Sequence, residues 1–287
     1  MIRILLDIGA TKTQWCCYHN HARWDFVTSG INFAVAQKST IHDVICEGMR
    51  ILHDQSPEFQ RGGVFADEVH AFGAGLVSES SIQLFTNQLK SVLPMAKVVD
   101  CQSDLVGAAM AVCGRESGIA AILGTGANTC QWDGKQIVQR INSGGFILGD
   151  EGSGAVLGRL FVTDYLKGLV PLDLAEKFRA QYPGTYPEIV AKVYRSDAPA
   201  RFLGSIAPFL IKEYPYYPYV QELVENNFRA FLERTVTRYD KFLPVGVVGG
   251  FGYACRTILQ RLGGSYGIRF SQFLPTPIDG LVQYYGV

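Results

Sequence analysis

Three glycine-rich turns are the segments of this sequence best suited to chemistry. Each follows a short apolar run, and they are DIGATKT at 7–13, GTGAN at 124–128 and GG at 249–250. Glycine lets the backbone approach a ligand closely, and successive backbone N–H groups can hold phosphate oxygens. One such turn alone is more often only a tight turn, but three of them together favour a nucleotide site.

The first turn also carries side chains that suit a nucleotide bound with a metal ion. Thr11 supplies a hydroxyl and Lys12 a cation. Asp7 stands at the end of an apolar run, where its carboxylate can orient Mg²⁺ through water, because Mg²⁺ keeps much of its hydration shell. The sequence therefore predicts a site for Mg²⁺ and ATP phosphates at this turn.

Two common nucleotide signatures do not fit these turns. A Walker P-loop requires GxxxxGK[ST] at the start of a helix, whereas the segment 9–13 is too short for this motif and leads into a strand. A Rossmann fingerprint requires GxGxxG, and the segment 124–126 lacks the third glycine. Both of these superfamilies are excluded.

Carboxylates at two further places could contact a substrate. Asp104 begins a predicted helix, where it could cap the helix or accept a proton from a hydroxyl. The segment 144–154 (GGFILGDEGSG) has the glycines of a ligand loop and places Asp150 and Glu151 side by side. Glu151 could serve this site or cap a helix that starts near Ser153, and the sequence leaves both roles open.

The elements that must position these residues form a mixed α/β pattern in the first half of the chain. Apolar runs and helical periodicity predict strands at 2–6, 14–18, 23–27, 68–72 and 97–99, and helices at 39–54, 79–92 and 104–113. The second half is mostly helical around a few strands. We expect helices at 153–168, 172–181, 186–195, 199–213, 217–240, 253–262 and 276–285, and strands at 245–248 and 267–270.

Part of this pattern occurs twice. The segments 4–15 and 121–132 align without a gap, and a polar turn and a third strand follow each of them. The identical residues are Leu6, Gly9, Ala10, Gln14 and Trp15, which recur as Leu123, Gly126, Ala127, Gln131 and Trp132. Chance can produce such a match, but the shared third strand favours an internal duplication with two lobes facing each other.

Composition narrows the classes of function. The 287 residues include 26 basic and 26 acidic side chains, so no basic field favours nucleic acid or an anionic membrane surface. No apolar run reaches the length of a membrane span, and the N-terminus does not resemble a signal peptide. The seven cysteines form no C-x-x-C pair, which favours neither disulfides nor a metal site. We expect a cytoplasmic protein.

The motifs resemble those of a known superfamily. DxGxTKT between two N-terminal strands, GTG in the second half and a late VVGG look like the sugar kinase/Hsp70/actin superfamily. Within it, GDEGS at 149–153 is similar to a block of the N-acetylglucosamine kinase and BadF/BcrA/BcrD ATPase-like family. The resemblance implies an α/β actin-like ATPase fold of two ribonuclease-H-like lobes, 1–115 and 116–287, with a nucleotide cleft between them.

The resemblance also implies roles for individual residues. It assigns ATP to Gly9, Thr11, Lys12, Thr125, Gly126, Gly249 and Gly250, and Mg²⁺ to Asp7. It assigns the sugar to Asn32, Asp104, Ala127, Asn128, Ser143, Gly144, Gly145 and Asp150, with Asp104 as the catalytic base. Many eukaryotic members have a tryptophan before GDEGS where this chain has SGGF at 143–146, so the sugar's substituents need not be contacted in the same way.

The implied activity is ATP-dependent phosphorylation of an amino sugar, N-acetylglucosamine at its 6-hydroxyl, by a chain that closes on its substrate. An ATPase activator of an iron–sulfur enzyme is the alternative, for which Cys101, Cys113 and Cys130 would be candidate ligands. A nucleotide-dependent regulator is a third interpretation. The helical stretch 155–240 could help to form the interface of a homodimer, but no residue in it indicates such an interface.

Overall fold

The computed structural model describes residues 1–20, 22–33, 36–55 and 66–286. The chain divides into two compact units, which we call the first and second units. The first comprises Met1–Gly114 together with Pro277–Val287, and the second comprises Arg115–Thr276. The predicted boundary at 115/116 is close to this division, but the C-terminal segment belongs to the first unit and not to the second lobe that the sequence predicts for it.

A five-stranded sheet forms the centre of the first unit, in the order β3-β2-β1-β4-β5. Strand β1 pairs antiparallel with β2 and parallel with β4. The elements are β1 (Ile2–Ile8), β2 (Lys12–His19), β3 (Ala22–Ser29), α1 (Lys38–Gln55), β4 (Glu68–Gly73), α3 (Glu79–Val92), β5 (Val98–Ser103), α4 (Asp104–Cys113) and α14 (Ile278–Tyr285). Each helix and strand predicted between residues 1 and 113 is present.

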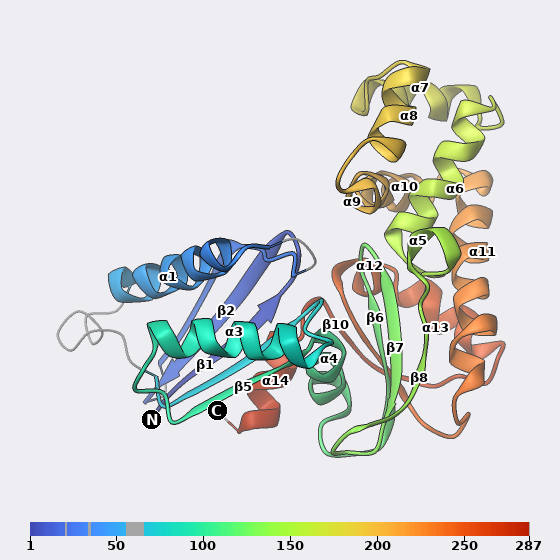
Figure 1. Ribbon diagram of the computed structural model, residues 1–287. Coiled ribbons are helices and arrows are strands. Elements are labelled where there is room, and N and C mark those ends of the chain that lie inside the picture. Colours follow the sequence, from blue (N-terminus) through green and yellow to red (C-terminus); the bar gives the residue numbers. More distant parts are fainter. Residues whose placement is uncertain (21, 34–35, 56–65, 287) are drawn as a thin grey trace. The chain divides into compact units, whose positions relative to one another are not determined.

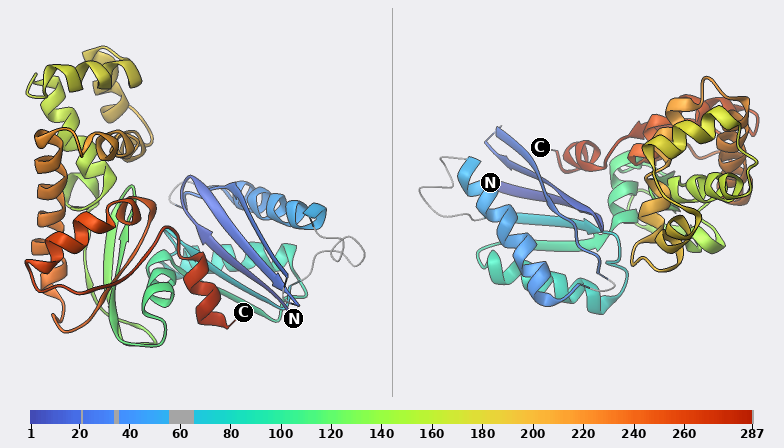
Figure 2. Two further views of the ribbon diagram at one scale, coloured as in Figure 1. Left: turned by 180° about the vertical axis from the view of Figure 1, so that it is seen from behind. Right: turned by 90° about the horizontal axis from the view of Figure 1, so that it is seen from above.

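Successive side chains of β1 point to opposite faces of this sheet. Ile4 and Leu6 pack with Trp15 in a core that α1 and α3 cover. The opposite face, which carries Asp7, is covered by α4 and α14 (Figures 1 and 2). Helix α14 packs against α4 so closely that a Cβ at Gly280 would lie 2.3 Å from the carbonyl oxygen of Ala111, which explains why this segment belongs to the first unit.

The second unit repeats the same sheet, in the order β10-β9-β6-β7-β8. Its elements are β6 (Gly118–Leu123), β7 (Ala127–Trp132), β8 (Ile137–Ile141), α5 (Gly145–Leu148), α6 (Gly154–Leu166), α7 (Leu172–Gln181), α8 (Tyr186–Tyr194), α9 (Pro199–Gly204), α10 (Ala207–Glu213), α11 (Pro218–Arg234), β9 (Val245–Val248), α12 (Gly250–Ala254), α13 (Arg256–Gly264) and β10 (Phe270–Leu274). A single apolar core joins the sheet to these helices.

The duplication is therefore confirmed in topology but not residue by residue. Read from β3 and from β8, both sheets have three antiparallel strands followed by two parallel ones. Trp15 lies opposite Leu6, whereas Trp132 lies opposite Gly118. The ungapped sequence match thus aligns residues that have different places in the two hairpins.

Several predicted boundaries in the second unit were wrong. The helix expected at 199–213 is broken into α9 and α10, because Pro208 in the first turn of α10 cannot donate a helical hydrogen bond. The helix expected at 253–262 begins earlier, at Gly250, and is interrupted before Arg256. The short helix α5 was not predicted.

Candidate functional site

The first glycine turn is supported by the end of β3. The N–H of Gly9 donates to the carbonyl of Lys12 at 3.0 Å, and the N–H groups of Gly30 and Ile31 donate to the carbonyls of Thr11 and Gly9. A Cβ at Gly30 would lie 2.4 Å from the backbone nitrogen of Lys12, so only glycine allows this approach. The turn is held in place by main-chain contacts, which leave the Thr11 and Lys12 side chains exposed.

Asn32 comes directly after this support. Because Ile31 is hydrogen-bonded to Gly9, the chain places Asn32 next to the first turn. Its side chain is exposed, and its carbonyl accepts a hydrogen bond from the N–H of Ala36 at 2.8 Å. Asn32 thus lies beside the first turn, with its side chain exposed.

Asp7 and Asp104 approach each other in the first unit. Asp7 is on the face of the sheet that α4 covers, and Asp104 is the first residue of α4. Burial and, to a smaller extent, the negative charge of Asp104 raise the pKa of Asp7 to about 7, although the charge of Lys12 opposes this shift. The N-cap of α4 is Ser103, whose Oγ accepts from the N–H of Val106, so helix capping does not account for the Asp104 carboxyl.

A second oxygen donor lies beside Asp7. Gln14 is directly opposite Asp7 in the β1–β2 pair, so the two side chains project from the same face. The Oε1 atom of Gln14 is buried and has no hydrogen-bond partner among the described residues. A carboxylate and a neutral amide oxygen suit hydrated Mg²⁺, which binds proteins through few oxygen ligands and keeps several waters. The side chains of Asp7 and Gln14 therefore fit hydrated Mg²⁺, the ion that the sequence predicts at this turn.

The second glycine turn is joined to the start of α6. The N–H groups of Gly154 and Ala155 donate to the carbonyls of Gly124 and Thr125 at 2.9 and 3.0 Å. A Cβ at Gly126 would lie 3.0 Å from Oδ2 of Asp150. The turn between β6 and β7 and the loop before α6 thus form one local structure.

Asp150 has an unusual backbone conformation. Its φ of 55° is in the left-handed region, which costs energy for a residue with a side chain. The N–H of Asp150 donates to the carbonyl of Ser143, and its carbonyl accepts from Ser153. Burial raises the pKa of the Asp150 carboxyl, while hydrogen bonds from Ala127 and Ser143 oppose this shift. Strain of this kind is often found at functional sites.

Two residues of α11 fix the rest of this loop. The side chain of Asn227, which is 2% exposed, accepts from the N–H of Gly152 and donates to the carbonyl of Ser153. Glu151 accepts a hydrogen bond from Arg234 at 3.1 Å. Ser153 is the N-cap of α6, so Glu151 does not cap this helix.

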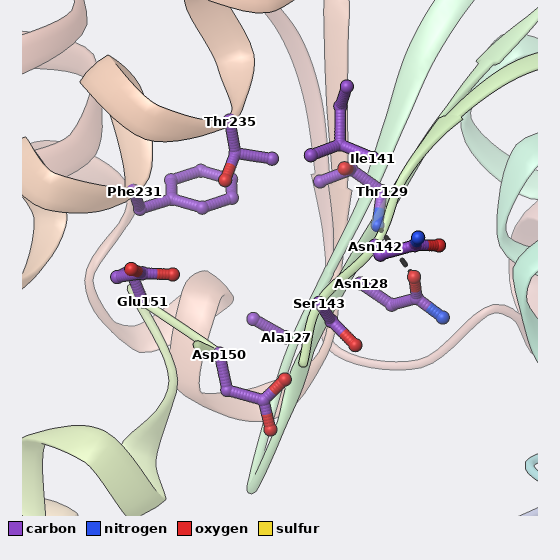
Figure 3. A pocket seen from close by; sticks show the side chains of 10 residues that line it. All are labelled: Ala127, Asn128, Thr129, Ile141, Asn142, Ser143, Asp150, Glu151, Phe231 and Thr235. Carbon is purple, nitrogen blue, oxygen red and sulfur yellow. Dashed lines mark hydrogen bonds between the residues drawn. The ribbon is translucent and has the colours of Figure 1, made fainter. Parts of the chain in front are cut away.

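The loop and the β7–β8 hairpin enclose a small recess (Figure 3). Its walls include the predicted residues Ala127, Asn128, Ser143 and Asp150, and also Phe231 and Thr235. In Figure 3 the carboxyl of Glu151 lies on the side of Phe231, whereas that of Asp150 points the opposite way. The cavity of about 20 Å³ has room for a water molecule rather than a sugar ring. The second unit thus groups four of the predicted sugar-binding residues around a small recess.

The third turn connects β9 to α12. Gly249 has a φ of 123°, and a Cβ there would lie 2.4 Å from the carbonyl oxygen of Leu123. Its N–H donates to the carbonyl of Leu274. Gly249 and Gly250 therefore lie beside the end of β6, close in the fold to the second turn.

The predicted residues thus form two groups, one in each unit. Asp7, Lys12 and Asp104 interact in the first unit, and the turn at 124–126 contacts the loop at 143–154 in the second. Sequence reasoning missed Gln14, Asn227 and Phe231 as parts of the site. A polar residue opposite Asp7 could have been found from the strand register, but nothing in the sequence relates α11 to the loop.

The fold defines the class of protein. Two lobes, each with a sheet of three antiparallel and two parallel strands, make up the actin-like ATPase fold. Proteins from Chromobacterium violaceum and Carboxydothermus hydrogenoformans share this fold. The first, provisionally named an N-acetylglucosamine kinase, has a TM-score of 0.71 and 19% identity over 99% of this chain and 98% of its own. The second, ethanolamine utilization protein EutJ, has a TM-score of 0.54 and 14% identity over 98% and 87%.

A third structure is similar enough to show the family. A protein from Porphyromonas gingivalis, also provisionally named an N-acetylglucosamine kinase, is 36% identical over 98% of both chains, with a TM-score of 0.90. No protein-family model and no curated protein sequence matches the chain. The chain belongs to the N-acetylglucosamine kinase/BadF-BcrA-BcrD ATPase-like family of the sugar kinase/Hsp70/actin superfamily. None of the described helices is long and apolar enough to cross a membrane.

Proposed function

We propose that this protein transfers the γ-phosphoryl group of ATP to a hydroxyl of a small amino sugar, with N-acetylglucosamine and its 6-hydroxyl as the expected acceptor. The observation that carries the proposal is the proximity of Asp104 to Asp7, seen in the effect of one charge on the pKa of the other. A base and a metal-binding carboxylate must lie near each other for phosphoryl transfer. Membership of a family of sugar kinases supports the same activity.

Asp104 is the proposed catalytic base. It would accept the proton of the attacking sugar hydroxyl as the bond to phosphorus forms and the bond to the β-phosphate oxygen breaks. Its place at the start of α4 fixes the carboxyl on the rigid sheet–helix framework of the first unit. Asn32, which follows the strand end that supports the first turn, would bind another sugar hydroxyl.

The glycine turns are proposed to hold the nucleotide. Gly9, Thr11 and Lys12 would contact ATP phosphates in the first unit, and Thr125 and Gly126 would do so in the second. Asp7 and Gln14 would hold hydrated Mg²⁺, which when bound neutralises phosphate charge during transfer. Gly250, where a Cβ would meet no atom within 4 Å, would leave room for the adenosine, while Gly249 lets the backbone pass close to the end of β6.

Asp150 is proposed to select the sugar. Burial raises the pKa of Asp150, and its backbone is held in the left-handed region. Hydrogen bonds from sugar hydroxyls would stabilise the buried carboxylate. Ala127, Asn128, Ser143, Gly144 and Gly145 would complete the contacts on this side. N-acetylglucosamine itself is expected from the relatives rather than from these side chains.

The activator alternative gains no support from the cysteines. Burial raises the pKa of Cys101 to about 11 and that of Cys113 to about 12, which disfavours the thiolates that bind iron–sulfur clusters. Cys130 is buried as well. Among the described residues there is no group of three or more His, Cys, Asp or Glu side chains that could hold a metal ion.

The test is a screen for ADP release with N-acetylglucosamine, glucosamine, N-acetylmuramic acid and glucose as acceptors. The proposal predicts release that depends on Mg²⁺ and on an amino sugar, with little hydrolysis when no sugar is added. An absorbance scan of anaerobically purified protein should show no iron–sulfur band. ADP release that is independent of every sugar, together with such a band, would favour the activator instead.

A further inference from the structure

A second, larger cavity in the second unit is lined by residues of α5, α6, α8 and α9. These four helices are labelled in Figure 1. The volume of the cavity is about 520 Å³, within the range of sites that bind small organic molecules. Apolar side chains such as Val162, Leu166, Ile189 and Leu203 form most of its wall. It shares no lining residue with the recess beside Asp150, so it is a separate site.

One cationic side chain lines this cavity. Arg159, in the second turn of α6, lines the cavity, and its Nε atom is buried without a hydrogen-bond partner among the described residues. Its guanidinium forms no ion pair within the described part of the chain, where many other arginines form one. The nearby Thr163 hydroxyl donates to the Arg159 carbonyl at 2.8 Å and does not accept from the guanidinium.

An unpaired N–H in such a place has an energetic cost. A buried donor that has lost its water and gained no acceptor destabilises the protein. A guanidinium pairs best with a planar anion, to which it can donate two parallel hydrogen bonds. A ligand with an anionic group would therefore satisfy Arg159, while an apolar body would fill the remaining volume.

We propose that this cavity binds a small organic anion with an apolar body, such as an aromatic or branched aliphatic carboxylate, through Arg159. The ligand would contact Phe146 and Ile147 of α5, the short helix that leads to Gly149 and Asp150. Charge complementarity favours a small anion over a peptide segment, because the described lining offers one cation in a mostly apolar wall. The proposal does not depend on the kinase activity.

Two fluorescent probes test this inference without ATP or sugar. 8-Anilino-1-naphthalenesulfonate has an apolar body and a sulfonate, and N-phenyl-1-naphthylamine has nearly the same body without the charge. Titration of the full chain should give saturable binding of both probes. Arg159→Gln should weaken the sulfonate probe about tenfold or more and leave the neutral probe nearly unchanged.

Two further variants locate the binding. Val190→Trp, which fills the cavity from α8, should abolish binding of both probes while circular dichroism and the melting temperature stay close to those of the wild type. Arg179→Gln removes the same charge from α7 outside the cavity and should change neither affinity. Equal loss of sulfonate binding in the two arginine variants, or undiminished binding in Val190→Trp, would overturn the proposal.

Discussion

The carboxyl groups of Asp7 and Asp104 interact within the first unit, where Asp104 adds to the effect of burial and raises the pKa of Asp7 to about 7. The two residues come from the end of β1 and the start of α4, which the fold brings to one face of the sheet. Two carboxylates so placed repel each other unless a cation is present. Lys12 supplies part of that charge, and a hydrated Mg²⁺ bound with ATP would supply more.

Asp7→Asn should make the ligand-free protein more stable than the wild type, and this difference in the free energy of unfolding should increase with pH. The folded-state pKa of about 7 exceeds the usual value of 3.8, so the folded protein binds more protons than the unfolded chain between these values. The wild type therefore loses stability through this window, by up to about 1.4 kcal/mol per pH unit, and the variant does not. Thermal melts in a chelator should show an advantage for Asp7→Asn that is larger at pH 8 than at pH 5.

The control for this experiment is Asp43→Asn, on the exposed surface of α1. It makes the same chemical change without removing a buried carboxyl. An advantage of Asp7→Asn that stays constant with pH would contradict the raised pKa.

Gln14→Leu should weaken the binding of Mg·ATP more than that of metal-free nucleotide. The buried Oε1 atom opposite Asp7 is the group that the substitution removes, and loss of one hydrogen bond from metal-bound water should reduce affinity about 3- to 10-fold. Isothermal titration with ATP in Mg²⁺ and in chelator measures the difference. Gln139→Leu, on the exposed part of β8, is the control, and equal losses in both conditions would remove Gln14 from the metal side.

Gly126→Ala should raise KM for the sugar, because its Cβ would lie 3.0 Å from Oδ2 of Asp150 and displace that carboxyl. Gly124→Ala, in the same turn, meets no atom within 4 Å and should leave KM for the sugar close to that of the wild type. We expect an increase of about tenfold for Gly126→Ala, as for loss of one hydrogen bond to a charged group. The measurement is steady-state kinetics with varied sugar concentration. Similar sugar KM values for the two variants would contradict a role of Asp150 in sugar binding.

Asn227→Asp should loosen the loop that carries Asp150. The new carboxylate can still accept from the N–H of Gly152 but cannot donate to the carbonyl of Ser153. A buried unsatisfied carbonyl costs about 1–3 kcal/mol, so both the melting temperature and sugar affinity should fall, while ATP affinity should not. Asn226→Asp, at the exposed neighbouring position, is the control, and equal melting temperatures for the two variants would show that Asn227 does not support the loop.

The first unit could be predicted from sequence because its elements are short, local and strongly patterned. Ile41, Val44, Ile45, Met49 and Leu52 at helical spacing form the buried face of α1. The apolar alternation in β1 and β2 likewise determines which side chains face the core. The mixed α/β class followed from the order of strands and helices, whereas the two-lobe actin-like fold was implied by the resemblance of the glycine motifs to a known superfamily.

The remaining features depend on contacts between distant segments. Helix α14 belongs to the first unit because it packs against α4. No local sequence pattern predicts this contact. The contribution of Asn227 rests on hydrogen bonds to residues more than 70 positions away. The sequence match aligned Trp15 with Trp132, although these residues have different places in their hairpins. Hairpins of similar sequence can differ in strand register.

The central claim is that Asp104 accepts the proton from a sugar hydroxyl during transfer from ATP. The most direct measurement is phosphorus NMR of the products formed from ATP, Mg²⁺ and N-acetylglucosamine by the wild type and by Asp104→Asn, with Asp43→Asn as the control. We predict a sugar 6-phosphate from the wild type and from Asp43→Asn, and a kcat at least ~10²-fold lower for Asp104→Asn. Near-wild-type turnover by Asp104→Asn, or only inorganic phosphate from the wild type, would contradict this account.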